Sequence, residues 1–363
     1  MIVRYGKDFD MRRINRDLSA ISGWIKESEA LASEFWSSVS QEVPRCRVCS
    51  SADRKLFMRF FDRYDYFECK GCGMLYLGQV PQCKTIYEAD ENNANGDCYM
   101  DESIFEERVN MIARPKVDFV LDVCNSFENG HSMEWVGCSA SNLNHSWKHE
   151  GRSGPTSWLD VGCGGGDILY YLSYYKGITC EGIEADKREV QLCQKRGLQV
   201  VKDFIDTRNP SQEVCRLLAR NDIVSLFNVL EHVDEPSQMV EYLYASMKKG
   251  SVLVLEVPRH PSAASFANLT SGGKTYRHLV PPAHISVFSE KSMETLLCGK
   301  FKIIGKWGFG QGFADMVNNA MFLSGKEEND LYLKVLECSN QMQRVFDEAG
   351  LSDSMIFVAV REE

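Results

Sequence analysis

The chain of 363 residues contains no run of about 18 consecutive apolar residues, the length that a membrane-spanning helix requires. Its first six residues lack the apolar centre of a secretory signal, and no internal repeat is visible. These absences argue against membrane-spanning, secreted and repeat proteins. We therefore expect a cytoplasmic protein with one large domain and one or two small modules.

The chain is also short of basic residues, because 41 Lys and Arg stand against 51 Asp and Glu and give a formal net charge of −10. Such a chain lacks the broad positive field with which nucleic-acid binders neutralise phosphates, so nucleic acid is not the expected partner. Most of the fourteen cysteines lie singly. In a chain of this size, that scatter predicts reduced thiols rather than a disulfide framework.

Four cysteines depart from this scatter, because they form two pairs of the C-x2-C type. Nineteen residues separate Cys46 and Cys49 from Cys69 and Cys72. Two such pairs can place four thiolates tetrahedrally around one Zn²⁺, and the chain between them is long enough for a small hairpin. Since four protein ligands leave no coordination position open, the spacing predicts a structural zinc ribbon.

Aromatic and basic residues alternate between the two cysteine pairs, for example Phe57, Arg59 and Arg63. Such a mixture can stack bases, so an RNA-binding ribbon is the alternative interpretation. Residues 45–80 carry seven Lys or Arg against four Asp or Glu, a small excess. A module of this size also needs aromatic residues for its core, which favours the structural role.

The pattern along the chain divides it into four segments. Strands and helices alternate in the last of them, which predicts an α/β fold with a mostly parallel sheet covered on both faces. The segments are an amphipathic helical segment at 1–42, the zinc ribbon at 43–84, a helix with a linker or lid at 85–156, and the α/β domain at 157–363. The long segment 259–288 of this domain is predicted to form part of a substrate site.

A glycine loop follows the first predicted strand of this domain, with Gly162, Gly164 and Gly166 in the pattern G-x-G-x-G. Glycines let a ligand touch the backbone and permit a tight turn from strand to helix. A dinucleotide fingerprint would have its third glycine at position 167, where Asp167 stands. An acid at a helix start disfavours a pyrophosphate and tolerates a ligand with positive charges.

Polar residues follow the next strands of the predicted sheet, at the edge where open α/β folds bind ligands. Glu184 ends the second strand, 18 residues beyond Gly166, and is placed to accept both hydroxyls of a ribose. Asp203 follows the third strand and is the candidate partner of an adenine amino group. Asn228 ends the fourth strand. Together with the glycine loop, these residues predict a nucleoside-containing cofactor.

This series of motifs resembles that of class I S-adenosylmethionine-dependent methyltransferases. The resemblance implies a Rossmann-like sheet of seven strands whose last strand is antiparallel. It also implies that Asp160 and the loop from Gly162 to Gly166 surround the methionine part of the cofactor, that Glu184 binds the ribose and that Asn228 lies near the methionine end. The motifs are Asp160 to Gly166, Gly182 to Glu184, Asn228 to Val233, Glu256 to Pro258, His284 to Ser289 and Gly350 to Val360.

The four-cysteine segment ahead of such a domain is similar to the zinc-headed methyltransferases of deoxysugar, polysaccharide and natural-product pathways, including sugar C-methyltransferases. The resemblance to those C-methyltransferases implies a Glu-His pair in the segment of His284. Here the pair is Ala283 and His284. The missing glutamate disfavours methylation of carbon.

Methyl transfer to a hydroxyl needs a group that takes the hydroxyl proton, and histidine is suited to this near neutral pH. His284 is the first candidate base and His232 the second, while Tyr276 and His278 are candidate acceptor contacts. We expect a methyltransferase that uses S-adenosylmethionine, carries a structural zinc ion and modifies a hydroxyl of a sugar, nucleotide sugar or glycan. An RNA methyltransferase, a sugar C-methyltransferase and a non-enzymatic cofactor sensor are the alternatives, and a homodimer is left open.

Overall fold

The computed structural model describes residues 1–7, 18–35, 40–81, 101–128, 155–270 and 278–362. Tyr276 and residues 85–100 and 129–154 of the predicted helix and linker lie outside these residues. No helix among the described residues is long and apolar enough to cross a membrane.

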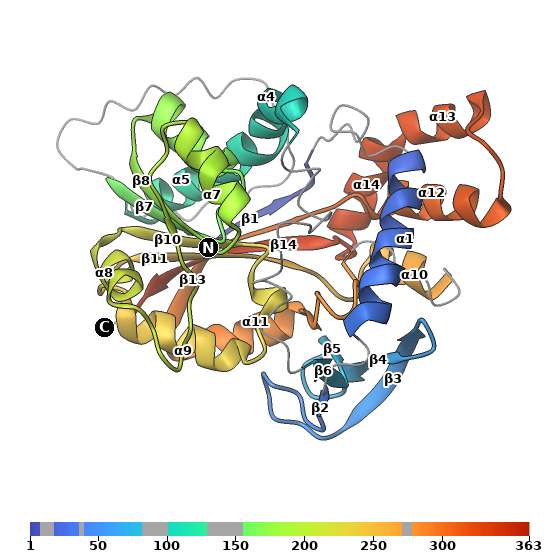
Figure 1. Cartoon of the computed structure of the whole chain (residues 1–363), viewed down its shortest axis with the longest axis horizontal. Coiled ribbons are helices and arrows are strands. Elements are labelled where there is room, and N and C mark those ends of the chain that lie inside the picture. Colours follow the sequence, from blue (N-terminus) through green and yellow to red (C-terminus); the bar gives the residue numbers. More distant parts are fainter. Residues whose placement is uncertain (8–17, 36–39, 82–100, 129–154, 271–277, 363) are drawn as a thin grey trace.

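A sheet of eight strands forms the centre of the molecule (Figure 1). Each neighbouring pair is parallel except the two pairs made by β14, which runs antiparallel to both β13 and β11. The doubly wound fold is therefore confirmed. In order of pairing the strands are β1 (Ile2–Tyr5), β13 (Phe301–Phe309), β14 (Ser354–Arg361), β11 (Val252–Pro258), β10 (Ile223–Phe227), β7 (Ser157–Val161), β8 (Thr179–Glu184) and β9 (Val200–Lys202).

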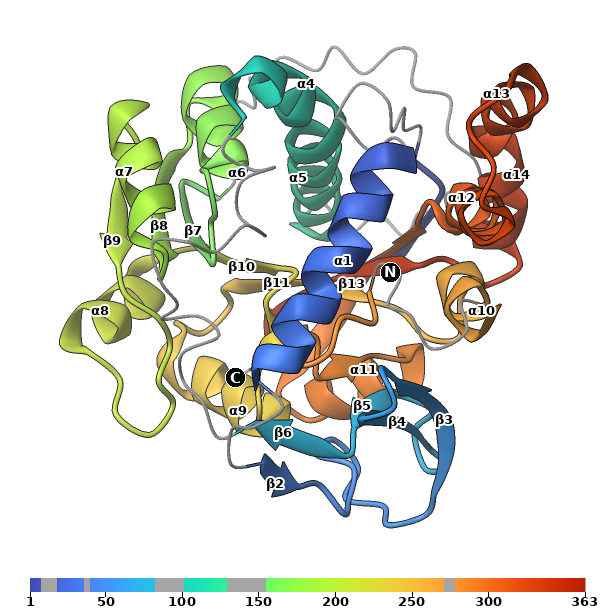
Figure 2. The same cartoon turned by 45° about the vertical axis from the view of Figure 1, so that its right-hand side comes forward.

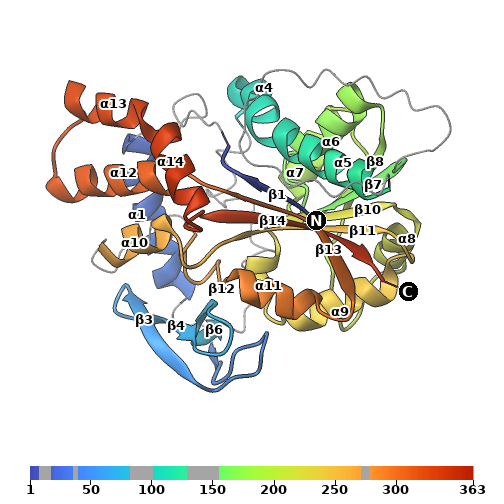
Figure 3. The same cartoon turned by 180° about the vertical axis from the view of Figure 1, so that it is seen from behind.

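Helices cover both faces of this sheet, because side chains of its buried strands alternate between two apolar layers. In β7, Trp158 packs into one layer and Leu159 into the other. Figure 3 shows the two helical layers from behind. One layer contains α5 (Arg114–Glu128), α6 (Asp167–Tyr171) and α7 (Lys187–Lys195), and the other contains α8 (Gln212–Arg220), α9 (Pro236–Ser246) and α11 (Glu290–Leu297).

The sheet has one strand more than the seven expected. Residues 1–42 were predicted to be helical, but Ile2–Tyr5 pairs in parallel with β13, and the indole N–H of Trp307 donates to the carbonyl oxygen of Gly6 at 2.9 Å. Four residues give too short a pattern to separate a strand from a helix turn. The helix of this segment is α1 (Leu18–Phe35), followed by β2 (Ser40–Glu42).

A group of helices lies beside the sheet, next to α1 (Figure 2). These helices are α10 (Ala263–Thr270), α12 (Gly312–Ser324), α13 (Asp330–Glu337) and α14 (Ser339–Glu348). The buried carboxylate of Asp353 accepts the backbone N–H groups of Ala264, Gln311 and Gly312. It thereby fixes the starts of both α10 and α12.

Short helical elements lie around the predicted cofactor loop. The segment before α5 contains η3 (Glu102–Ile104), α4 (Phe105–Arg108) and the π-helical η4 (Val109–Ala113), while the π-helical η5 (Leu172–Lys176) continues α6, and the 3₁₀ turn η6 (Leu230–His232) follows β10.

The cysteine-rich module is a second small sheet below α11 (Figure 1). Its pairing order is β12-β5-β4-β3, and β12 comes from the α/β domain. The module is therefore not the separate unit that the boundaries 43–84 describe. Its strands are β3 (Arg54–Phe60), β4 (Tyr64–Cys69), β5 (Leu75–Leu77) and β12 (Ser286–Val287), while β6 (Gln79–Pro81) pairs with β2.

Candidate functional site

The glycine loop connects β7 to α6 and has an unusual backbone. Gly162, Gly164 and Gly166 have φ angles of +68°, +55° and +84°, which side-chain-bearing residues rarely adopt. A Cβ at Gly162 would lie 2.6 Å from Cγ2 of Val229, and one at Gly166 would lie 2.6 Å from Cδ1 of Leu198. A Cβ at Gly164 would make ordinary contact with a Glu189 oxygen at 3.7 Å, so the positive φ rather than crowding favours glycine at this position.

Glu184 at the end of β8 is bound to this loop. Its Oε2 accepts the Gly164 N–H at 2.8 Å, and its Oε1 accepts the Asp186 N–H at 2.9 Å. The side chain is 9% exposed, and burial raises its pKa. The carboxylate thus reaches the middle of the loop, as the spacing predicts.

Two further carboxylates lie close to the loop. Asp160 is 2% exposed, accepts the Ser225 hydroxyl at 2.6 Å and has its pKa raised to about 7, chiefly by burial. Burial and the charge of Glu184 raise the pKa of Glu189 to about 8. Buried acids with raised pKa values are stabilised by a nearby positive charge. The site is therefore suited to a cationic ligand.

Asp167 does not contribute to that negative charge as the sequence argument assumed. Its carboxylate is paired with Arg108, whose Nε and Nη2 donate at 2.9 and 2.7 Å. Arg196 further holds the loop by donating to the carbonyl oxygen of Gly165 at 2.5 Å. The acids around the loop are instead Asp160, Glu184 and Glu189.

Asn228 and Asp203 lie at the carboxyl edge of the sheet, as predicted. Asn228 has a φ of +56°, and its N–H donates to the Glu256 carbonyl at 3.0 Å. Asp203 accepts the Ser211 hydroxyl at 2.6 Å and the Phe204 N–H at 2.8 Å. Its carboxylate therefore also organises its own turn, and its adenine contact stays a prediction.

Lys116 is a site residue that the sequence analysis missed. It is 6% exposed on α5, its Nζ lies 2.5 Å from Oε2 of Glu256, and its charge opposes the raised pKa of Asp160. The available signal was its place beside Ala113, Val117 and Val120 on the buried face of the helix. A lysine on such a face is rarely buried without a partner.

The structure brings the two predicted histidines together. Their ring centroids lie 4.7 Å apart at an interplanar angle of 79°. Nδ1 of His232 lies 2.9 Å from the Ala283 carbonyl oxygen, and Nδ1 of His284 lies 2.9 Å from that of His278. Burial lowers the pKa of His232 to about 4, and burial together with His232 lowers that of His284 to about 3. Both rings are neutral at pH 7.

Glu231 joins these histidines and was not among the predicted site residues. It is 1% exposed, and one potential ligand atom from each of Glu231, His232 and His284 lies within 4.8 Å of the others. The Ile285 N–H donates to the Glu231 carbonyl at 3.0 Å and ties the two histidine segments together. His278 contributes its backbone to this arrangement, while its acceptor contact stays a prediction.

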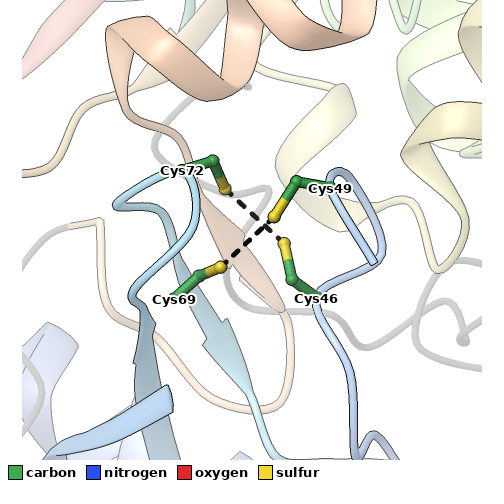
Figure 4. A group of neighbouring side chains, drawn as sticks. All are labelled: Cys46, Cys49, Cys69 and Cys72. Carbon is green, nitrogen blue, oxygen red and sulfur yellow. Dashed lines mark hydrogen bonds between the residues drawn. The ribbon is translucent and has the colours of Figure 1, made fainter. Parts of the chain in front are cut away.

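The four predicted cysteines converge, as Figure 4 shows. The Sγ atoms of Cys46 and Cys72 lie 3.6 Å apart, those of Cys49 and Cys69 lie 3.4 Å apart, and all four lie within 4.8 Å of one another. Tetrahedral Zn–S bonds of about 2.3 Å place sulfurs about 3.8 Å apart. A Cβ at Gly71 would lie 2.9 Å from Cys49 Sγ, so the turn is closed tightly around the cluster. The residues fit a zinc ion.

The cysteine module contacts both histidine segments. Arg47, inside the first cysteine pair, lies 3.5 Å from a Glu235 oxygen, and its carbonyl accepts the Ser237 hydroxyl at 2.7 Å. On the other side, the Leu77 N–H donates to the Ile285 carbonyl at 2.9 Å, and the Tyr66 hydroxyl donates to the His284 carbonyl. The module therefore supports the residues that follow His232 and surround His284.

Comparisons with known proteins agree with this geometry. The family model described as "Methyltransferase domain" matches residues 113–299. The chain is similar to a ubiquinone biosynthesis O-methyltransferase of Bordetella avium (28% identity over 171 residues, 44% of this chain and 66% of that protein) and to a mitochondrial one of Candida albicans (32% over 130 residues, 34% and 38%). It thus spans less than two thirds of the length of these relatives.

Two solved structures are also similar to this chain. A SAM-dependent methyltransferase from Archaeoglobus fulgidus has 18% identity and a TM-score of 0.38, covering 56% of this chain and 85% of that one. A plantazolicin methyltransferase in complex with SAH has 12% identity and a TM-score of 0.38, covering 74% and 95%.

Proposed function

Since this chain belongs to the methyltransferase domain family, we propose that it transfers the methyl group of S-adenosylmethionine to a hydroxyl of a small polar acceptor, with a sugar, nucleotide sugar or glycan as the first choice. The observation that carries this proposal is the positive-φ glycine loop, whose Gly164 N–H is held by the buried carboxylate of Glu184 at the end of the next strand. A nucleoside with a cationic tail suits a glycine loop surrounded by three acids with raised pKa values.

The chain's own residues would hold the cofactor as follows. Glu184 accepts hydrogen bonds from the ribose hydroxyls, and Asp203 accepts from the adenine amino group. Asp160 and the glycine loop surround the methionine part, whose ammonium and sulfonium groups offset the acids. Lys116, which is paired with Glu256, offsets part of the negative charge of Asp160. The four cysteines bind a structural Zn²⁺ that leaves no open coordination position.

The acceptor lies on the histidine side of the site in this proposal. During transfer, the acceptor oxygen attacks the methyl carbon, the C–S bond breaks with its electron pair left on sulfur, and a base takes up the hydroxyl proton. Enzymes supply alignment and exclusion of water for such a displacement. His284 is the proposed base that takes the hydroxyl proton, and the ring of His232 lies next to it.

Oxygen is favoured as the acceptor atom by two observations. The curated relatives are named O-methyltransferases, and Ala283 stands where the sugar C-methyltransferases have a glutamate. Because those relatives are named for ubiquinone biosynthesis, a hydroxyl on an aromatic ring is the second candidate acceptor.

RNA is a weaker candidate because arginines of the cysteine module are already engaged. Arg59 pairs with Asp65 at 2.6 Å, Arg47 lies near Glu235, and Arg54 donates to the Val43 carbonyl at 2.6 Å while lying over the Phe67 ring. Paired arginines offer less charge to a phosphate backbone.

Methyl-labelled S-adenosylmethionine, incubated with the enzyme and with separate fractions of nucleotide sugars, glycans, phenolic metabolites and RNA, tests the proposal. We expect the label in a sugar-containing fraction, where mass spectrometry should detect it as a methyl ether on a former hydroxyl. Label in RNA alone would overturn the acceptor assignment. Tight cofactor binding without transfer to any fraction would support a sensor instead.

Cofactor binding should depend on pH through Asp160. Its pKa of about 7 results from burial and from Glu184 and Glu256, opposed by the Ser225 hydroxyl and Lys116. The ionised carboxylate is the form that attracts a cationic ligand, so affinity is lost as pH falls through 7. Between pH 7.5 and 6 we expect about a tenfold weaker binding, because the ionised fraction falls by about that factor.

Calorimetric titration with S-adenosylmethionine at each pH measures this effect. In Asp160→Asn the binding should be weak and should keep only the smaller pH dependence that comes from Glu189. An unchanged pH profile in that variant would assign the dependence to another group.

A further inference from the structure

Glu231, His232 and His284 form a compact group of one carboxylate and two imidazoles. They come from two segments, the turn η6 after β10 and the segment immediately before β12. Their potential ligand atoms lie within 4.8 Å of one another, and the rings meet edge to face. This arrangement brings three groups that bind metals to one place, although 51 residues lie between the two histidines.

The hydrogen bonds of the two rings determine which nitrogen carries the proton and which carries the lone pair. A backbone carbonyl can only accept, so the Nδ1 atoms bonded to Ala283 and His278 must carry the protons. In a neutral ring the lone pair is then on Nε2. A ring that donates its other N–H to a backbone carbonyl is the usual arrangement of a metal-binding histidine.

Glu231 supplies an independent observation. Its Oε2 is buried and has no hydrogen-bond partner in the described part of the chain, although the side chain is only 1% exposed. The nearby buried cation, Lys116, is paired with Glu256 instead. A buried carboxylate without a partner is costly, and a bound cation would remove that cost.

We propose that Glu231, His232 and His284 bind one divalent transition-metal ion, separate from the ion of the cysteine cluster. Two nitrogens and one oxygen suit ions such as Mn²⁺, Fe²⁺ or Zn²⁺, whereas four thiolates favour softer ions. Three protein ligands leave coordination positions open. Since the proposed function places the acceptor beside these histidines, an acceptor hydroxyl and a neighbouring oxygen would fill the open positions.

The role of the ion in catalysis rests on the proposed function. A hydroxyl bound to a divalent ion loses its proton to water more readily, and the resulting oxyanion attacks the methyl carbon while the C–S electron pair stays on sulfur. In this form of the mechanism the histidines bind the ion, and water takes the proton that the proposed function assigns to His284. The same geometry holds the acceptor oxygen in a fixed position beside the cofactor.

Binding of Mn²⁺ to the full chain tests this site without an activity assay. The protein is first loaded with one equivalent of Zn²⁺ to fill the cysteine cluster, and Mn²⁺ binding is then measured by the loss of its free electron paramagnetic resonance signal. We expect one Mn²⁺ per chain. Glu231→Gln and His284→Gln should each weaken its binding by at least tenfold.

The matched control is Glu241→Gln, which removes an exposed carboxylate of α9 that pairs with Lys300. It should bind Mn²⁺ like the unmodified protein, and all variants should retain one Zn²⁺ and their circular dichroism. Failure to bind Mn²⁺, or binding that Glu231→Gln leaves unchanged, would overturn the site. Methyl transfer that survives removal of all ions except the cysteine-bound Zn²⁺ would overturn its catalytic role. Mn²⁺ binding with no methylated acceptor would support the site and count against the proposed function.

Discussion

Replacing Cys72 with serine is expected to lower the rate of methyl transfer by about 100-fold while binding of S-adenosylmethionine changes by less than about threefold. The cysteine module holds both histidine segments, through Arg47 on one side and through β5 and Tyr66 on the other. A structural zinc ion stabilises such a module strongly. Its loss would let the segment of His284 shift, and a displacement of about 1 Å at a reacting group costs about 100-fold in rate.

The cofactor loop lies elsewhere, between β7 and α6, and is held by Glu184 and Arg196 rather than by residues of the cysteine module. Binding measured by calorimetry therefore also reports whether the variant is folded, and the zinc content reports the state of the cluster. Cys298→Ser is the matched control, because this exposed cysteine lies outside the module. Full activity in a zinc-free Cys72→Ser protein would show that the module does not position His284.

The second large effect is expected for Glu184→Ala, which should weaken S-adenosylmethionine binding by at least about 100-fold. The carboxylate holds the Gly164 and Asp186 N–H groups and is proposed to accept both ribose hydroxyls. Hydrogen bonds to a charged group contribute about 1.5 to 3 kcal/mol each, and tenfold in affinity corresponds to about 1.4 kcal/mol. Two lost bonds therefore account for a change of this size.

Glu181→Ala provides the comparison on the same strand. Glu181 lies three residues earlier, pairs with Arg220 and does not contact the loop. Its replacement should leave the dissociation constant within about twofold. Equal affinities for the Glu184→Ala and unmodified proteins would remove Glu184 from the cofactor site.

Much of the fold could be predicted from local pattern. The apolar strand from Ser157 to Val161, the glycines after it and the acid at 184 are close in sequence, and the cysteine spacing directly predicts a four-sulfur cluster. What was missed depends on contacts between distant residues. Arg108 pairs with Asp167 from 59 residues away, and four residues at the start of the chain become a strand only by pairing with β13.

The same reason explains the histidine group. His232 and His284 could each be named from a motif, but nothing local shows that their rings meet or that Glu231 is buried beside them. Lys116 was missed because an ordinary helical pattern contains lysines at many positions. Its burial is decided by the strands that pack over it.

The shared strand β12 also makes the boundary between the cysteine module and the α/β domain a poor place to cut the chain. Met74 and Leu75 of the module pack in one continuous apolar core with Val287 and Met293 of the domain. A fragment beginning at Thr156 would leave β12 without its neighbour β5 and β13 without its neighbour β1. Open strand edges of this kind pair readily between molecules. Folding of this chain is therefore a single cooperative event, and the catalytic half is expected to aggregate when it is produced alone.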